Sequence, residues 1–278
     1  MLKNLACSLA VLVLFGLTCA AETLRVMSFN VRYPASGDGP NRWELRQDTV
    51  VRTIRHKNPD LMGTQELFYI QGQYIVENLP EYEWFGNSRR GNREDEHMGV
   101  FYKRSKLRVI ESGNFWLSTT PEIAGSQAWS ATLPRMVTWA LFEIKVSGKR
   151  FYFYNTHFHH TAEGAQARLN SARLIADRIS NLPKDIPLIL TGDFNTAAPD
   201  SEPYKILATP LSDAWATAVR KIGPQGTNSG FRGGAGRSRI DWIMYRGPFT
   251  VPEAETVAYN EDGRYPSDHY PVLAVLEF

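Results

Sequence analysis

Asp193 and Asn195 are the first residues whose types and spacing could do chemistry. They follow the apolar run 186–190 and a Thr-Gly pair, which indicates a buried strand that ends in polar residues. Along an extended chain, side chains two residues apart point to the same side, so these two present a carboxylate and an amide together. Such a pair fits a functional site or an Asx-type turn, and the segment alone favours neither.

Other predicted strands also end or begin with side chains that bind metal ions or transfer protons. These strands are indicated for residues 24–31, 60–66, 150–157 and 270–276. The residues at their ends are Asn30, Glu66, His157, and Asp268 with His269. Glu66 taken alone fits an ordinary exposed loop residue. Because the strand ends agree, we expect them to converge on one edge of a sheet and form a concave polar site.

Oxygen ligands dominate this set, which favours a hard cation. The carboxylates are Glu66, Asp193 and Asp268, and the amides are Asn30 and Asn195. They suit Mg²⁺ or Mn²⁺, ions that bind oxygen-rich substrates such as phosphates. Histidines at 157, 159 and 160 raise the question of zinc, but the pattern His-x-His-x-Asp-His fails at Thr161.

Asp241 lies near the start of an apolar strand predicted for residues 240–245. A buried carboxylate is unfavourable unless it has a partner, so we expect one. Further strands are indicated near Trp84 and at 99–102, 107–117 and 137–146. Helices are indicated at 43–56, 68–79 and 163–180, with a short one inside 199–210 and a glycine-rich loop at 223–236.

The first twenty residues have the character of a secretory signal peptide. Lys3 precedes an apolar run at 5–17, and small residues follow at 18–20. We therefore expect export to the periplasm or the medium and one mature domain at 21–278. Cleavage after Ala20 removes both cysteines, Cys7 and Cys19, and with them any disulfide or thiol chemistry. Lipid anchoring through Cys19 is the alternative, although residues 16–18 match the required small-residue motif poorly.

The charge balance excludes a strongly basic nucleic-acid surface. Loss of Lys3 reduces the 31 basic residues to 30, against 29 acidic ones. No later run approaches the roughly 18 to 20 apolar residues of a membrane span. Arginines cluster at 89, 90 and 93 and again at 232, 237 and 239. These clusters suit an anionic substrate or solvated loops.

Taken together, these segments resemble the endonuclease/exonuclease/phosphatase superfamily, the group of the DNase I, exonuclease III, sphingomyelinase and deadenylase types. The matching motifs, in the family's order, are Ser-Phe-Asn (28–30), Gln-Glu (65–66), Asn-Thr-His (155–157), Gly-Asp-Phe-Asn (192–195), Arg-Ile-Asp (239–241) and Ser-Asp-His (267–269). Residues 43–46 and 116–122 resemble exported bacterial members near the deadenylase-like branch. The resemblance implies an α/β fold, a four-layer α/β/β/α sandwich of two facing mixed β-sheets.

The resemblance also implies a role for each residue. Metal binding falls to Asn30, Glu66 and Asp268; catalysis falls to His157, Asp193, Asn195, Asp241 and His269; substrate binding falls to His160 and Arg239. Asp193 and Asn195 would orient water and phosphate, and Asp241 would hold His269 in one tautomer. The general base is either Asp193 or His269. His159 departs from the family's pattern, in which Asp is common at this position, and could alter substrate preference.

We therefore expect a monomeric, Mg²⁺- or Mn²⁺-dependent phosphoesterase that uses in-line attack of water. A phosphodiesterase or nuclease-type enzyme, acting on nucleotides, nucleic acid or lipid headgroups, is the leading interpretation. The alternatives are a sugar-phosphate or inositol-phosphate phosphomonoesterase and, on the same fold, a binding module without catalysis.

Overall fold

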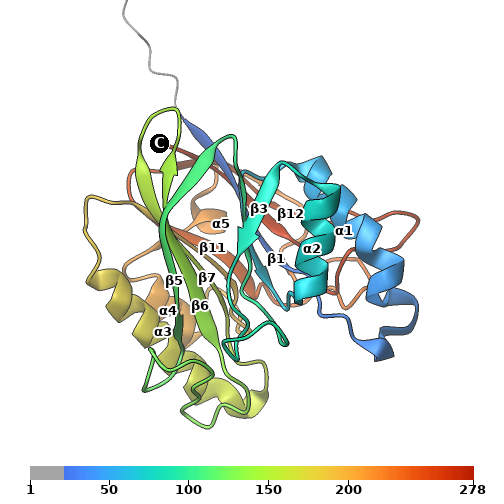
Figure 1. The fold of residues 1–278 in the computed structure, drawn as a ribbon, viewed down its shortest axis with the longest axis horizontal. Coiled ribbons are helices and arrows are strands. Elements are labelled where there is room, and N and C mark those ends of the chain that lie inside the picture. Colours follow the sequence, from blue (N-terminus) through green and yellow to red (C-terminus); the bar gives the residue numbers. More distant parts are fainter. Residues whose placement is uncertain (1–21) are drawn as a thin grey trace, which may run out of the picture.

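Residues 22–278 form two β-sheets that face each other, with helices on both outer sides (Figure 1). These are the residues that the computed structural model describes. The predicted signal peptide of residues 1–20, with Cys7 and Cys19, lies outside them. Within residues 22–278, no helix has the length and apolar character needed to cross a membrane. The layer order of helices, sheet, sheet and helices confirms the predicted α/β/β/α sandwich.

The first sheet has seven strands in the order β10-β12-β13-β1-β2-β4-β3. They are β1 (Thr23–Asn30), β2 (Leu61–Gln65), β3 (Tyr82–Phe85), β4 (Val100–Lys103), β10 (Arg220–Ile222), β12 (Thr250–Thr256) and β13 (Val272–Glu277). β1 and β2 pair in parallel, with Asn30 opposite Gln65. Because parallel strands end at the same edge, Asn30 and Glu66 lie together there.

The second sheet has six strands in the order β5-β6-β7-β8-β11-β9. They are β5 (Leu107–Trp116), β6 (Met136–Ile144), β7 (Arg150–His157), β8 (Leu188–Asp193), β9 (Ser212–Asp213) and β11 (Asp241–Arg246). β7 and β8 are parallel and place His157 opposite Asp193. β8 and β11 are antiparallel and place Asp241 opposite Asp193. The register therefore sets three candidate residues in one row across this sheet.

Helices complete the two outer layers. They are α1 (Trp43–Lys57), α2 (Tyr69–Asn78), α3 (Ala165–Ser180), α4 (Glu202–Leu207) and α5 (Ala214–Thr217), with short 3₁₀ turns η1 (Ser36–Asn41) and η2 (Ala162–Gly164). Ile54 of α1 and Ile75 of α2 join an apolar cluster with residues of the first sheet. Ile175 of α3 and Leu207 of α4 join another with the second sheet. Each sheet is thus buried on its helix-covered face as well as between the sheets.

The side chains between the two sheets change in character along each strand. In the direction of the candidate site they are Leu24, Val26, Ser28 and Asn30 on β1; Leu61, Gly63 and Gln65 on β2; Phe151, Phe153, Asn155 and His157 on β7; Ile189, Thr191 and Asp193 on β8; and Tyr245, Ile243 and Asp241 on β11. Side chains alternate along a strand, so every second residue contributes to this space. The candidate site is the last step of a progression from apolar to polar residues.

Candidate active site

Asp193 lies at the centre of the row that the strand register builds. Its Oδ2 is 3.4 Å from Nε2 of His157 and 3.8 Å from Nδ1 of His269. Asp193 is 1% exposed and Asp241 2%. Burial, reinforced by the charge of Asp241, raises the pKa of Asp193. Three ionisable groups, His157, Asp241 and His269, thus surround one buried carboxylate.

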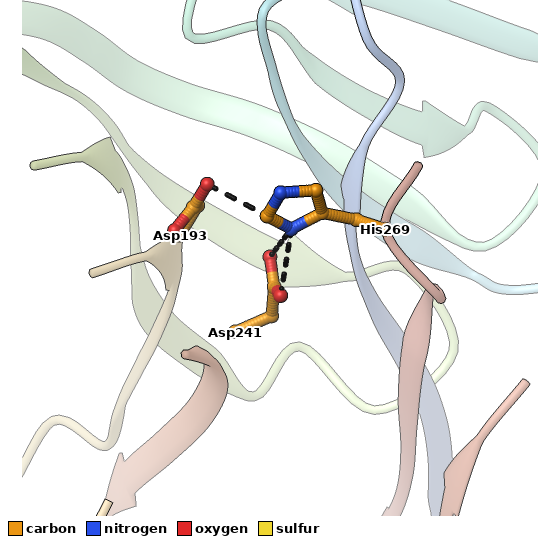
Figure 2. A group of neighbouring side chains, drawn as sticks. All are labelled: Asp193, Asp241 and His269. Carbon is orange, nitrogen blue, oxygen red and sulfur yellow. Dashed lines mark hydrogen bonds and ion pairs between the residues drawn. The ribbon is translucent and has the colours of Figure 1, made fainter. Parts of the chain in front are cut away.

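His269 is the partner that we expected for the buried carboxylate of Asp241. Its Nδ1 lies 2.9 Å from Oδ2 and 3.2 Å from Oδ1 of Asp241. Figure 2 shows the imidazole close to both carboxylates, with Asp193 of β8 to its left and Asp241 of β11 below it. Burial lowers the pKa of His269, but the charges of Asp241 and Asp193 outweigh burial and raise it well above its ordinary value. Asp241 therefore fixes the ring and stabilises its protonated form.

Asn228 is a site residue that sequence reasoning missed. Its side-chain amide lies 3.0 Å from Nε2 of His269. A neutral ring accepts a hydrogen bond from the amide nitrogen there, whereas an imidazolium requires the amide oxygen. The sequence contains one sign of this role, an amide side chain inside the glycine-rich segment 223–236, but that segment was predicted only to be a loop. Both ring nitrogens of His269 therefore have a partner.

Asn195 links Asp193 to His157. Its backbone N–H donates to Oδ1 of Asp193 at 3.0 Å, which closes the Asx-type turn that was one of the two alternatives. Its Nδ2 donates to the Phe158 carbonyl at 3.1 Å and lies 3.0 Å from Nε2 of His157. The carbonyl fixes the amide orientation, so Nε2 of His157 is an acceptor. Burial and the charge of Arg135 lower the pKa of His157 to about 3. His157 is therefore neutral, and the turn and the site are the same structure.

Asn30 joins the two sheets at the site. Its Nδ2 donates to Oε1 of Glu66 and to Oδ2 of Asp193, each at 3.0 Å. The backbone N–H of Tyr33 donates to Oε2 of Glu66 at 3.2 Å. Glu66, Asp193 and Asn30 thus form one hydrogen-bonded group across the gap between the sheets.

Asp268 and Glu66 form the oxygen-rich part of the site. Burial outweighs the charge of His269 and raises the pKa of Asp268, and the negative charge of Glu66 adds to the rise. A buried carboxyl group whose charged form is disfavoured, beside a second carboxylate, provides a place where a divalent cation is favoured, and their oxygens suit Mg²⁺ or Mn²⁺. Asp193, Asp241 and His269 also offer ligand atoms within 4.8 Å of one another, but Nδ1 of His269 is already used by Asp241. The residues present therefore fit a hard cation best at Glu66 and Asp268.

Arg135 and Glu96 are two further residues that sequence reasoning missed. Arg135 is buried, with NH1 3.4 Å from Oε2 of Glu96 and NH2 3.2 Å from Nδ1 of His160. The same Glu96 oxygen lies 3.7 Å from Nδ1 of His157. This chain of charges holds His160, which is exposed, at the rim of the site. Arg89, from the first predicted arginine cluster, also pairs with Glu96, at 2.9 Å.

The side chains of His159 and Arg239 each form a hydrogen bond with another segment of the protein. Nε2 of His159 accepts a hydrogen bond from the backbone N–H of Thr132 at 3.0 Å, so the ring holds the loop before β6. The guanidinium of Arg239 donates to Oδ2 of Asp213 at 2.6 Å in a buried ion pair. The guanidinium of Arg239 is thus engaged by Asp213, and a substrate contact by Arg239 stays a prediction.

The structure thus brings together most of the predicted site. The residues joined directly by contacts are Asn30, Glu66, His157, Asp193, Asn195, Asp241 and His269. Asp268 is close enough for its pKa to respond to Glu66 and His269. A buried carboxylate, a carboxylate-oriented imidazole and an oxygen-rich cation position together suit hydrolysis at an anionic centre.

Comparison with known proteins agrees with this chemistry. Residues 27–269 match the model of the Endonuclease/Exonuclease/phosphatase family, so the chain belongs to that family. Its relatives are hydrolases of phosphoester bonds, and enzymes of the family depend on divalent metals. A family protein of known structure from Bacteroides thetaiotaomicron is 32% identical, with a TM-score of 0.87 over 93% of this chain and 98% of that one.

Two further relatives have more specific names. A mannosyl-6-phosphatase of Bacteroides thetaiotaomicron is 32% identical, with a TM-score of 0.85 over 92% of this chain and all of that one. Tyrosyl-DNA phosphodiesterase 2 of Danio rerio is 22% identical over 78% of this chain and 58% of its own length. The chain spans about half the length of the curated relatives it matches.

Proposed function

We propose that this chain is a divalent-metal-dependent phosphoester hydrolase that acts by in-line attack of water on phosphorus. The observation that carries the proposal is the row of His157, Asp193 and Asp241, with His269 against it and Asn30 joining it to Glu66. Family membership over residues 27–269 supports the same chemistry.

In this proposal Glu66 and Asp268 hold Mg²⁺ or Mn²⁺, with Asn30 beside them. When bound, the cation neutralises charge that develops on the phosphoryl oxygens. The amide of Asn30 keeps the Glu66 and Asp193 carboxylates at fixed positions, with hydrogen bonds of 3.0 Å to each. The metal position and the buried carboxylate are thereby held in register.

In this proposal Asp193 accepts the proton of the attacking water. The charges of Asp241 and Asp193 favour the protonated form of His269, so this ring stabilises the charge of Asp193 from 3.8 Å and has no free nitrogen for a further proton. Asp241 keeps the imidazole oriented, and the amide of Asn195 with the neutral ring of His157 borders the phosphoryl position. His160 contacts the substrate from the rim.

For the substrate we propose a phosphate monoester of a sugar, the second of the two sequence-based interpretations. A mannosyl-6-phosphatase is 32% identical across nearly the whole chain. The structure of the fish tyrosyl-DNA phosphodiesterase 2 in complex with single-stranded DNA is 21% identical, a level at which the likeness supports the fold alone. A phosphodiesterase is therefore the second candidate.

Hydrolysis by the mature protein, measured as inorganic phosphate released from the monoesters and as p-nitrophenol released from the diester, tests both parts of the proposal. Mannose 6-phosphate and p-nitrophenyl phosphate are compared with bis(p-nitrophenyl) phosphate, with Mg²⁺ or Mn²⁺. We expect the monoesters to be preferred, excess EDTA to abolish turnover, and Asp193→Ala to lower kcat at least about 10³-fold. Asp48→Asn, on the exposed face of α1, is the control and should retain full activity. Hydrolysis that survives EDTA or the Asp193 substitution would refute the proposal.

We also propose that the enzyme works outside the cytoplasm as a monomer. The amino-terminal sequence, with Lys3 before the apolar run 5–17, supports export. Detection of a mature form that begins near residue 21 in a periplasmic or culture fraction would test this, and a full-length cytoplasmic form would contradict it.

A further inference from the structure

A cavity of about 600 Å³ lies beside the candidate metal position. It is lined by the segment 32–38 and by Phe68, the residue that precedes α2. We call it the Arg32–Asp38 pocket. Its wall touches the site directly, because NH1 of Arg32 lies 3.8 Å from Oε2 of Glu66 and the N–H of Tyr33 donates to the same oxygen. A substrate whose phosphate meets Glu66 therefore has this pocket within reach of its esterified alcohol.

The pocket is held rigid by buried donors. Arg32 has a φ of +55°, an uncommon backbone conformation for a residue other than glycine. Its carbonyl accepts hydrogen bonds from NH2 of Arg46 at 2.6 Å and from Nε2 of Gln71 at 2.9 Å. Arg46 is 2% exposed and also binds the carbonyls of Val31 and Pro266. The surrounding structure therefore fixes the Arg32 end of the pocket before any ligand arrives, which favours specific recognition.

The charges in the pocket cancel. Arg32 donates from Nε and NH2 to the two carboxylate oxygens of Asp38, at 3.0 and 2.9 Å. A free arginine beside the metal would suit a second phosphate, as in a nucleic-acid backbone, but this one is neutralised by a bidentate partner. The pair instead offers hydrogen-bond donors and acceptors side by side, the combination that hydroxyl groups need.

Two aromatic rings complete the pocket. The rings of Tyr33 and Phe68 lie 6.2 Å apart and are tilted by 31°, and the guanidinium of Arg32 is 4.5 Å from the Tyr33 ring. Both aromatic residues are half-buried, so part of each faces the cavity. A sugar ring has an apolar C–H face that packs on such rings and hydroxyls that reach a polar pair. A lipid chain would use only the aromatic surface and leave the ion pair without a partner.

We infer that the Arg32–Asp38 pocket binds the sugar ring of the substrate, an uncharged hexose whose phosphate is placed against Glu66 and Asp193. This inference rests on the proposed function and extends it by assigning the residues that select the alcohol. Asp38 accepts hydrogen bonds from ring hydroxyls, and Tyr33 and Phe68 pack on the ring. All three are specificity residues, and none takes part in the proton transfers assigned above.

The test compares a sugar ester with an ester that has no hydroxyl groups. For Asp38→Asn and, separately, Tyr33→Leu, we expect the ratio of kcat/KM for mannose 6-phosphate to kcat/KM for p-nitrophenyl phosphate to fall at least about tenfold. Asp48→Asn and Ile70→Ala are matched controls outside the pocket and should leave this ratio unchanged. An unchanged ratio in both pocket variants would overturn the inference.

A binding measurement separates this inference from the proposed function. Mannose 6-phosphate is titrated calorimetrically into Asp193→Asn and into Asp193→Asn/Asp38→Asn, with Mg²⁺ present. We expect at least about tenfold weaker binding to the double variant, whether or not the wild type turns the sugar over. Turnover failure combined with this loss refutes the proposed function alone. Equal affinity of the two variants, or no binding to the first, refutes the sugar pocket.

Discussion

The space between the two sheets is filled in different ways at its two ends. At the end away from the site, apolar residues such as Phe153 and Ile189 form one buried cluster. Toward the site, the same inward-facing rows carry Gln65, Asn155 and Thr191, with Nε2 of Gln65 donating to Oδ1 of Asn155 at 2.7 Å. Thr191 donates to the same oxygen at 3.1 Å. The apolar end stabilises the sandwich, and the polar layer connects it to the site.

The difference teaches how a polar site can be set on a rigid base. Charged groups placed directly on an apolar core would lack partners, whereas an intervening layer of hydrogen-bonded amides provides them. Gly63 allows the two sheets to lie close together at this layer, since a Cβ at this position would lie 2.2 Å from Oγ1 of Thr191. We therefore expect substitutions at the apolar end to affect stability, those at the site to affect rate, and those in the layer to affect both.

The largest expected effect is on rate, at the polar end. Asp241→Asn removes the charge that holds and protonates His269, so kcat should fall about 10²- to 10⁴-fold. The melting temperature should fall as well, since the buried imidazole loses the carboxylate that pairs with it. Steady-state kinetics and thermal unfolding of the same preparation measure both quantities. A variant with nearly full activity would show that His269 does not need its carboxylate partner.

The largest expected effect on stability lies at the apolar end. Phe153→Ala empties part of a fully buried cluster in which the Phe142 ring lies 6.3 Å away. The free energy of unfolding should fall by about 3–5 kcal/mol. At a temperature where the variant is folded, kcat should remain within about twofold of the wild type. Denaturant titration together with activity assays tests this. A large loss of kcat in the folded variant would show that the apolar end also controls the rate, against the distinction drawn above.

An intermediate effect is expected in the polar layer. Asn155→Leu removes the hydrogen bonds that the Gln65 amide, the Thr191 hydroxyl and the Thr64 carbonyl make with Asn155. Each buried group that loses its hydrogen bond costs about 1–3 kcal/mol, so stability should fall measurably. The activity of the folded protein should also fall, because Asn155 is two residues from His157. Ile189→Val is the apolar control and should lower stability by about 0.5–1.5 kcal/mol without a change in kcat.

The smallest effect is expected at an exposed ion pair far from both regions. The hydrogen bond from Arg52 outweighs burial and lowers the pKa of Glu261 to about 2. A carboxylate with a lowered pKa adds stability above its unfolded pKa of about 4.3, and this contribution is lost as pH falls toward 2. Glu261→Gln should remove that part of the pH dependence, by less than about 1 kcal/mol at this surface position. Unfolding curves at pH 7 and pH 3 would show it, and an identical pH dependence in both proteins would contradict it.

Much of the fold was predictable because local patterns matched the final structure. The β-prone run at 150–157 is β7 without a change of boundary, and the helix predicted at 43–56 is α1 extended by one residue. β12 was missed because Pro252 and a shift of register between Thr250 and Glu253 interrupt the alternation of buried and exposed residues. A strand whose pattern breaks at a bulge gives no clear period.

The site was predictable where its residues lie at strand ends, and unpredictable where they lie in loops. The positions of His157, Asp193 and Asp241 are fixed by strand register, because register determines which residues of neighbouring strands lie opposite each other. Asn228 and Arg135 reach the site from segments outside strands, and no periodicity places them. Arg239 lies in the Arg-Ile-Asp motif, but it pairs with Asp213, a partner 26 residues away that sequence spacing does not reveal.

The most direct test of the account is a crystal of the protein soaked with Mn²⁺ and phosphate, with diffraction recorded at the manganese absorption edge. The account predicts one anomalous peak at coordination distance from the carboxylates of Glu66 and Asp268, with the phosphate between that peak and Asp193. A peak held instead by Asp193, Asp241 and His269, or no peak at saturating Mn²⁺, would contradict it.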